Sequence, residues 1–107
     1  MITINLRYSG INGNALKFAE EMEKSGIANK IRAEKGNLRY EYYLPLNDSE
    51  TVLLIDSWEN HQALDNHHKS PMMTKKAELR EKYDLHMTAE RFISAPENEI
   101  DDKYIRQ

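Results

Sequence analysis

The chain has 107 residues, of which 31% are charged, with a formal net charge of −3 and no cysteine. This length predicts one domain that buries about two thirds of its unfolded surface. The lack of cysteine excludes disulfides, thiolate catalysis and zinc–cysteine sites, and is compatible with the cytoplasm, where we expect the protein. Basic residues form no stripe, and the longest aliphatic run, Val52–Ile55, is too short for a membrane span. We therefore expect neither nucleic acid nor a membrane as partner.

The first half of the chain alternates between strand and helix patterns. Apolar side chains stand at every second position over residues 2–8, which predicts a strand. Asn14 is the expected cap of a helix whose apolar stripe drifts near Gly26, where we predict a bend. Gly36 is placed to follow the end of this helical segment. Residues 38–46 predict a second strand.

The second half repeats the alternation. Residues 52–58 predict a buried strand, and Asn60 is the expected cap of a short helix. Ser70-Pro71 predicts a new helix, because serine caps helices and proline favours the first helical position. Residues 85–94 predict the fourth strand. The buried side of the last helix is predicted to carry Met72, Met73, Ala77, Leu79 and Tyr83.

The order β-α-β-β-α-β predicts an α+β fold of the ferredoxin-like type, an antiparallel sheet with helices on one face. The third strand is apolar on both faces, so the face away from the helices needs a cover. A second copy of the same sheet is the economical cover, which predicts a homodimer. We assign residues 1–95 to this domain, and residues 96–107 to a polar tail that is flexible or clasps the partner.

A carboxylate, an indole and an imidazole converge in the second half of the chain. Asp56 and Trp58 lie two apart at the end of a predicted strand, so their side chains share a face. At about 100° per residue, the short helix places His67 at the centre of its apolar face and His68 toward the edge. An imidazole can act as a base near neutral pH. The pattern predicts a pocket formed by these three side chains, with His67 as the candidate catalytic base and Asp56 as the candidate catalytic carboxylate that orients His67 or binds a substrate hydroxyl.

Each of these residues also has a structural interpretation. His67 can be a core histidine bonded to a backbone carbonyl, and Trp58 can be a core anchor. Asp56 can be a partly exposed carboxylate paired with Arg7 or Arg39. A metal site is not expected, because His67 and His68 diverge on the helix and no other ligand spacing supports one.

The segment from residue 51 to residue 73 resembles the signature of the antibiotic biosynthesis monooxygenase domain family, which includes quinol monooxygenases. In that family the third strand ends in acid-x-Trp, followed by Ala-Leu, a histidine and a Ser/Thr-Pro helix start. Residues 34–41 also resemble the segment that leads into the family's second strand, and the resemblance covers residues 1–95. The matching residues of the signature are Asp56-x-Trp58, Ala63-Leu64, His67 and Ser70-Pro71.

This resemblance implies a dimeric α+β barrel that oxidises a quinol-like or polyphenolic molecule with dioxygen and without a cofactor. It implies that Asn5 holds a substrate oxygen and that Trp58 stacks on the substrate ring, and we place Tyr40 in the same substrate-binding set. Asn5 at a dimer interface and Tyr40 in sheet packing are the alternatives. The family more often has glutamate where this chain has the shorter Asp56.

Three alternatives to the monooxygenase function remain open or must be weighed. Residues 36–41 are similar to relatives that isomerise a small phosphorylated signalling sugar, for which Arg7 or Arg39 would have to turn inward. A non-catalytic binding dimer could use the same pocket. Haem-degrading relatives have tryptophan where this chain has His67, and their iron-ligating histidine falls near Lys76. Because a cationic lysine is a poor ligand, we expect no haem.

Overall fold

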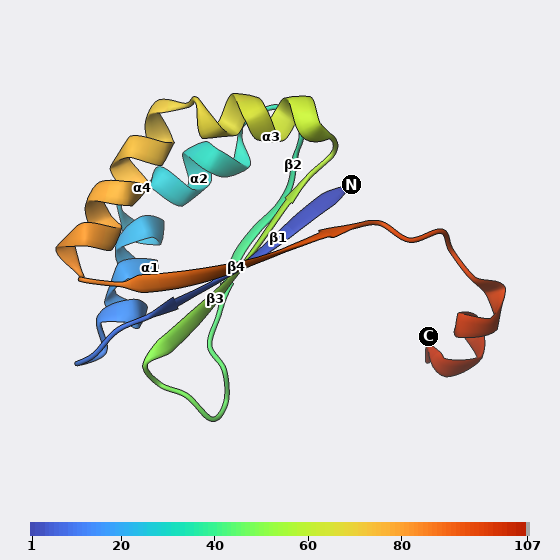
Figure 1. Ribbon diagram of the computed structural model, residues 1–107, viewed down its shortest axis with the longest axis horizontal. Helices are drawn as coiled ribbons and strands as arrows, with labels where there is room; N and C mark the ends of the chain where they lie inside the picture. Colours follow the sequence, from blue (N-terminus) through green and yellow to red (C-terminus); the bar gives the residue numbers. More distant parts are fainter. Residues whose placement is uncertain (107) are drawn as a thin grey trace.

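The computed structural model describes residues 1–106, apart from the side chains of residues 99 and 100, and contains one four-stranded sheet in the order β2-β3-β1-β4. All of its strand pairs are antiparallel. Helices α1–α4 gather on one side of this sheet (Figure 1). The prediction of a ferredoxin-like α+β fold is therefore confirmed. The elements are β1 (Ile2–Ser9), α1 (Asn14–Lys24), α2 (Ile27–Arg32), β2 (Asn37–Tyr43), β3 (Thr51–Trp58), α3 (His61–His68), α4 (Pro71–Lys82), β4 (His86–Ile93) and the 3₁₀ helix η1 (Glu99–Tyr104).

The core lies between the helices and the even-numbered residues of β1 and β3. Tyr8, Leu54 and Trp58 point from the sheet into this layer and are almost fully buried. Phe18 meets them from α1, with its ring centroid 4.9 Å from that of Tyr8. Each buried side chain of this size contributes roughly 1.5–3 kcal/mol to folding. The alternation seen in the sequence thus gives the sheet one strongly apolar face.

Several helix ends follow the predictions, and one does not. The Asn60 side chain accepts a hydrogen bond from the backbone N–H of Ala63 at 2.9 Å, and α4 begins at Pro71. Asn14, however, does not cap α1, because it is the first helical residue and Gly13 takes the cap position. The Asn14 amide donates instead to the backbone carbonyl of Tyr83 at 3.2 Å, which joins α1 to the end of α4.

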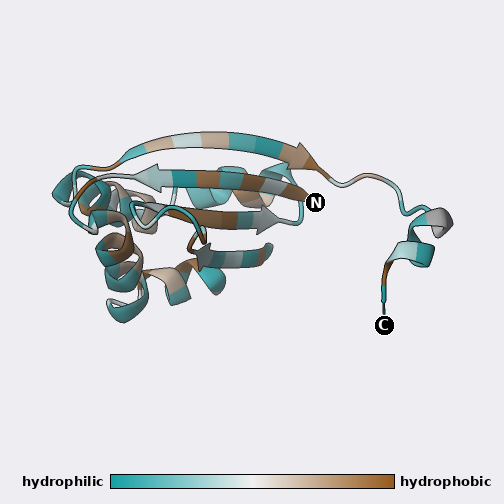
Figure 2. Cartoon of the chain, turned by 90° about the horizontal axis from the view of Figure 1, so that it is seen from below, coloured by the Kyte–Doolittle hydropathy of each residue, from teal (hydrophilic) through white to brown (hydrophobic). Residues whose placement is uncertain are grey.

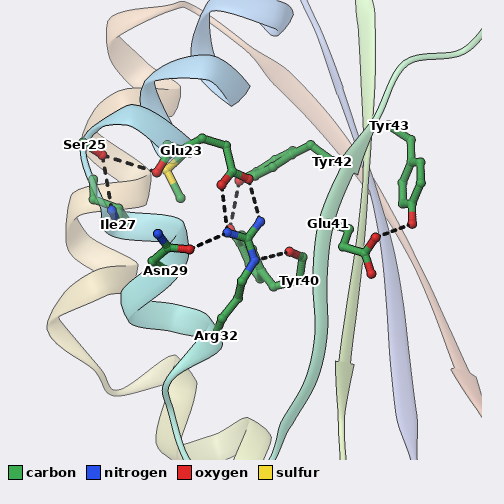
Figure 3. Close-up of polar contacts among 10 residues, drawn as sticks. Glu23, Ser25, Ile27, Asn29, Arg32, Tyr40, Glu41, Tyr42 and Tyr43 are labelled. Carbon is green, nitrogen blue, oxygen red and sulfur yellow. Dashed lines mark hydrogen bonds and ion pairs between the residues drawn. The ribbon is translucent and has the colours of Figure 1, made fainter.

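The predicted bend near Gly26 is a complete break between α1 and α2. Gly26 has φ 84°, a left-handed conformation that glycine adopts without the steric cost of a side chain. The break turns α2 onto β2, where Arg32 Nε donates to the backbone carbonyl of Tyr40 at 2.8 Å (Figure 3). The same guanidinium binds Glu23 of α1 through two hydrogen bonds. Strand β2 ends at Tyr43, earlier than expected, because Pro45 has no N–H to donate.

The face of the sheet away from the helices has no cover within residues 1–106. Strand residues alternate between apolar and polar along β1 (Figure 2), and the odd-numbered residues of β1 and β3 point to this open face. Leu53 and Ile55 are only half-buried there, and Phe92 of β4 is 49% exposed. The side-chain oxygen of Asn5 is buried without a hydrogen-bond partner among the described residues. Beyond β4, the tail extends away from the sheet (Figure 1).

We predict that two copies of the chain associate through this open face, because an exposed apolar sheet face is unfavourable in water. Light scattering at micromolar concentration should give twice the chain mass of 12.6 kDa. Ile55→Asp should shift the protein toward monomer, since it places a charge in the interface. Leu16→Asp, on the helical side, is the matched control and should leave the dimer intact. A stable wild-type monomer would contradict the prediction.

Candidate active site

A cavity of about 220 Å³ lies between the sheet and helices α3 and α4. Its floor comes from β1, β3 and β4, and its sides come from the two helices. Most of its lining is apolar, and its charged or titratable groups come from four different elements. The lining residues are Ile4, Leu6, Tyr8, Asp56, His67, His68, Met73, Lys76, Ala77, Arg80, Met87 and Ala89.

His67 is held in one orientation by a carboxylate from a distant loop. Its Nδ1 lies 3.0 Å from Oε2 of Glu34, in the loop between α2 and β2. Gly36 in this loop has φ 86°, and a Cβ there would come within 2.5 Å of the Ala63 Cβ. Glycine therefore lets the loop approach α3 closely and brings Glu34 within reach of the ring. Because the carboxylate accepts from Nδ1–H, Nε2 is the nitrogen left free to accept a proton.

Trp58 lies behind His67 and connects it to Asp56. The two rings stack with centroids 4.5 Å apart and planes at 25°. The indole Nε1 donates to Oδ1 of Asp56 at 2.8 Å, so one buried side chain contacts both expected catalytic residues. Burial raises the pKa of Asp56, and the positive charge of Lys76 opposes that rise. Glu34, His67, Trp58 and Asp56 form what we call the central network.

This arrangement differs from the expected one in which Asp56 orients His67. The histidine is paired with Glu34, and the hydrogen bond found for Asp56 comes from Trp58. The short aspartate side chain, on the same strand as Trp58, is directly beside the indole. Trp58 was expected to stack on the substrate, but its accessible surface is zero and it does not line the cavity. In this structure the indole supports His67 from behind.

The structure does not bring Asn5 and Tyr40 into the cavity. Asn5 lies on the open face of the sheet, since only the even-numbered residues of β1 face the helices. Tyr40 is buried below the cavity, and its hydroxyl shares a hydrogen bond with that of Tyr42 at 2.9 Å (Figure 3). Arg7 and Arg39 also belong to the open face, so neither turns inward.

The part of the chain that the structure describes shows neither a metal site nor a membrane span. Among the described side chains, no group of three or more histidine, cysteine, aspartate or glutamate residues is arranged to hold a metal ion. In the same part of the chain, no helix is both long enough and apolar enough to cross a bilayer.

The family model described as antibiotic biosynthesis monooxygenase matches residues 1–79. The chain belongs to the antibiotic biosynthesis monooxygenase family. Membership supports a monooxygenase-type function and a small-molecule substrate, in agreement with the cavity described above. None of the curated proteins matches the sequence significantly.

Solved structures from this family share the fold at low sequence identity. A Deinococcus radiodurans protein assigned to the antibiotic biosynthesis monooxygenases is 18% identical, with a TM-score of 0.79 over 92% of this chain and 96% of its own. SnoaB, a cofactor-independent oxygenase from Streptomyces nogalater, is 14% identical, with a TM-score of 0.74 over 90% and 94%. A Nitrosomonas europaea protein assigned to the same family is 11% identical, with a TM-score of 0.75 over 88% and 98%.

The sequence did not identify Glu34 and Lys76 as site residues, although both lie at the site. Glu34 was part of a resembling segment but was given no role, because its partner is 33 positions away. Lys76 was considered only as a poor iron ligand, yet it is the buried residue of α4 and is 6% exposed. The apolar residues expected on that side, Met73 and Ala77, are only half-buried. The available signal in the sequence was that Lys76 lies within the helix side predicted to be buried, among apolar residues.

Burial lowers the pKa of Lys76 to about 8, from an ordinary value of 10.5, although Asp56 opposes the change. The buried charge therefore destabilises the fold below about pH 8, and this cost disappears as the pH rises from about 8 to 10.5. Lys76→Met should raise the free energy of unfolding at pH 7 by about 1–3 kcal/mol. Urea denaturation at several pH values measures this, and the gain should shrink above pH 8.

Lys75→Met is the matched control, since Lys75 is the exposed neighbour on the same helix. Its substitution should change the free energy of unfolding by less than about 0.5 kcal/mol. A loss of stability in Lys76→Met would mean that the ammonium is paired within the fold.

Proposed function

We propose that this protein is a cofactor-independent monooxygenase that oxidises a quinol-like or polyphenolic small molecule with dioxygen. The observation that carries the proposal is the Glu34–His67 pair, which presents an oriented imidazole to a mostly apolar cavity. Membership of the antibiotic biosynthesis monooxygenase family supports the reaction class. The cavity supports a small substrate, because its volume of about 220 Å³ is below the roughly 300–1,000 Å³ of pockets for drug-sized ligands.

Proton removal is the step that His67 can assist. The anion of a quinol gives an electron to dioxygen far more readily than the neutral molecule does. His67 Nε2 would accept the hydroxyl proton, while Glu34 holds the ring and stabilises the imidazolium that forms. General-base assistance of this kind contributes roughly 10²–10⁴-fold to a rate.

The substrate supplies all four electrons that reduce dioxygen. One oxygen atom forms a new bond to a ring carbon and replaces its hydrogen, and the other leaves as water. A dihydroxybenzene and one dioxygen thereby give a hydroxyquinone and one water. His67 can return its proton to the departing oxygen, so the histidine ends the cycle as it began. The apolar walls exclude bulk water from the reactive anion.

In this proposal Asp56 binds an oxygen of the substrate. Its Oδ1 is occupied by the Trp58 indole, and the carboxylate lines the cavity. Because burial raises the pKa of Asp56, the group has a greater tendency to be protonated than an exposed aspartate. A protonated Asp56 could donate a hydrogen bond to a substrate oxygen, and an ionised one could accept from a substrate hydroxyl.

An isomerase of a small phosphorylated sugar is the second candidate. It is favoured by one observation, the presence of two cationic side chains, Lys76 and Arg80, in the cavity. Such an enzyme would move a proton without consuming oxygen. Aerobic and anaerobic incubation with a quinol panel separates the two reactions, and a thermal-shift screen of phosphorylated sugars tests the isomerase. A non-catalytic binding dimer would show ligand binding without turnover in either assay.

His67→Ala should lower the oxygen-dependent turnover number about 100-fold or more, because the base is removed. His67→Phe should lose as much activity while keeping a ring against Trp58, which separates the chemical role from the packing role. Oxygen consumption measures both, with circular dichroism to check folding. His68→Ala is the control and should retain most activity. Full turnover by His67→Ala would make His67 a core histidine.

Glu34→Gln should lower the turnover number by about ten- to a hundredfold with little change in KM, because the amide cannot stabilise the imidazolium. The matched control is Glu20→Gln, an exposed carboxylate on α1 that is remote from the cavity. Steady-state kinetics at saturating oxygen provides the measurement. Unchanged turnover in Glu34→Gln would show that the pair only holds the loop in place.

A further inference from the structure

Lys76 has a buried ammonium group that is attracted by the Asp56 carboxylate but makes no direct ion pair with it. The side chain lies on α4, lines the cavity and forms no hydrogen bond or ion pair with any side chain that the structure describes. Its Nζ instead lies over two aromatic rings, 5.2 Å from the centroid of Tyr40 and 5.6 Å from that of Tyr8. Asp56 lines the same cavity, but its hydrogen bond comes from Trp58. An ammonium has three donors, and none of them has an acceptor among the residues that the structure describes.

A purely structural role explains this lysine poorly. Burying a charge without a hydrogen-bonded counter-charge is costly, and the attraction of Asp56 together with two cation–π contacts offsets only part of that cost. Methionine would fill the same space between the two rings without the penalty. The charge is therefore best explained by a group that is absent from the free protein and that carries a negative charge.

The surroundings of Lys76 define what this group can be. Arg80 lies one helical turn further along α4, lines the cavity and is about one-third exposed, and its guanidinium lies 3.8 Å from the exposed Glu81 carboxylate. A second cation, paired only at the surface, therefore stands near the opening. Asp56 is the one carboxylate in the lining. The remaining lining around the ammonium is apolar and comes from Ile4, Leu6, Met73, Ala77, Met87 and Ala89. A ligand that matches both the cationic side chains and the apolar lining combines an anionic oxygen with an apolar body.

We propose that Lys76, assisted by Arg80, is an anion-binding site within the cavity, and that the substrate is a small aromatic carboxylate bearing quinol hydroxyls. The carboxylate would lie on the Lys76 ammonium while the ring extends along the apolar walls toward His67. This inference rests on the proposed oxygenase function and names the substrate class that it serves. Lys76 is then a specificity-determining residue, and His67 remains the base.

Benzoate and benzamide form a matched pair of probes, because they have the same shape and differ in charge. Neither is oxidised, so calorimetric titration of the wild-type protein at pH 7 measures binding alone. Benzoate should bind at least about tenfold more tightly than benzamide, as expected for a charge-assisted hydrogen bond. Equal affinities for the two probes would overturn the proposal.

The pH dependence of binding gives a test without any substitution. Benzoate affinity should fall as the pH rises through about 8, where Lys76 loses its proton, and benzamide affinity should not. The guanidinium of Arg80 in the same cavity should leave a residual preference for benzoate. A flat benzoate profile from pH 7 to 9 would count against Lys76. The titratable or charged groups that face this lysine are Tyr8 on β1, Tyr40 on β2, Asp56 on β3, His67 and His68 on α3, and Arg80 on α4.

Three variants assign the effect to this side chain. Lys76→Met should abolish most of the preference for benzoate, while Lys76→Arg should retain it because the guanidinium restores the charge. Arg80→Met should cause a smaller loss, since Arg80 lies nearer the solvent. Lys75→Met, on the exposed side of α4, should bind both probes as the wild type does. A preference that survives in Lys76→Met would overturn the assignment.

Turnover separates this inference from the proposed function. Oxygen consumption with 2,5-dihydroxybenzoate should exceed that with 2,5-dihydroxybenzamide or hydroquinone in the wild type, and Lys76→Met should reverse the order. If benzoate is preferred but no quinol is oxidised, the anion-binding site stands and the oxygenase function fails. If neutral quinols are oxidised equally well, the function stands and the site fails. If phosphorylated sugars compete with benzoate and no quinol does, the isomerase is favoured and the aromatic substrate is overturned.

Discussion

The stack of His67 on Trp58 is the contact on which the site depends. It places an imidazole against a fully buried indole, whose N–H is already committed to Asp56. Neither ring can turn without breaking the other's contact, and Glu34 restrains the remaining edge of the imidazole. Buried polar networks of this kind are rigid because every broken hydrogen bond leaves an unsatisfied group in a low dielectric. The central network thus holds the His67 imidazole at a defined point of the cavity wall.

The cavity lining carries more positive than negative charge, which favours an anionic ligand. Lys76 and Arg80 line the cavity with a single carboxylate, Asp56, whose pKa is raised by burial. The ammonium of Lys76 is stabilised by the faces of Tyr8 and Tyr40, and their hydroxyls are kept protonated because burial raises the pKa of both. An oxidation that begins from a phenolate benefits from such a positive field, since the field stabilises the anion without removing the apolar walls that exclude water.

The placement of all four helices on one side of the sheet determines both faces of the molecule. On the covered side the helices leave room for the cavity, because α3 is short and α4 turns away from it at Ser70-Pro71. On the uncovered side, half-buried Ile55 and the Asn5 oxygen, which has no hydrogen-bond partner among the described residues, lie on a sheet that no second layer covers within residues 1–106. The two faces therefore differ, since one carries the cavity and the other exposes apolar strand residues.

Local sequence patterns were sufficient for the order of the elements and for part of the site. The Asn60 cap and the Pro71 helix start depend on neighbouring residues, so the sequence alone determines them. The same holds for the shared face of Asp56 and Trp58 and for the inward direction of His67, which follow from the strand and helix periods. These patterns placed an acid, an indole and an imidazole around one volume.

Only the tertiary structure decided how these groups are paired. Glu34 reaches His67 because a loop with a left-handed glycine packs against α3, a contact that no local period encodes. Lys76 is buried because it lies on the side of α4 that packs on the sheet, where Met72, Leu79 and Tyr83 also contact the core. Asn5 faces away from the cavity because the register of β1 with β3 fixes which alternate residues meet the helices. The sequence by itself determined which groups are available, and long-range packing determined which of them meet, because side-chain contacts between distant elements depend on register and helix rotation rather than on spacing.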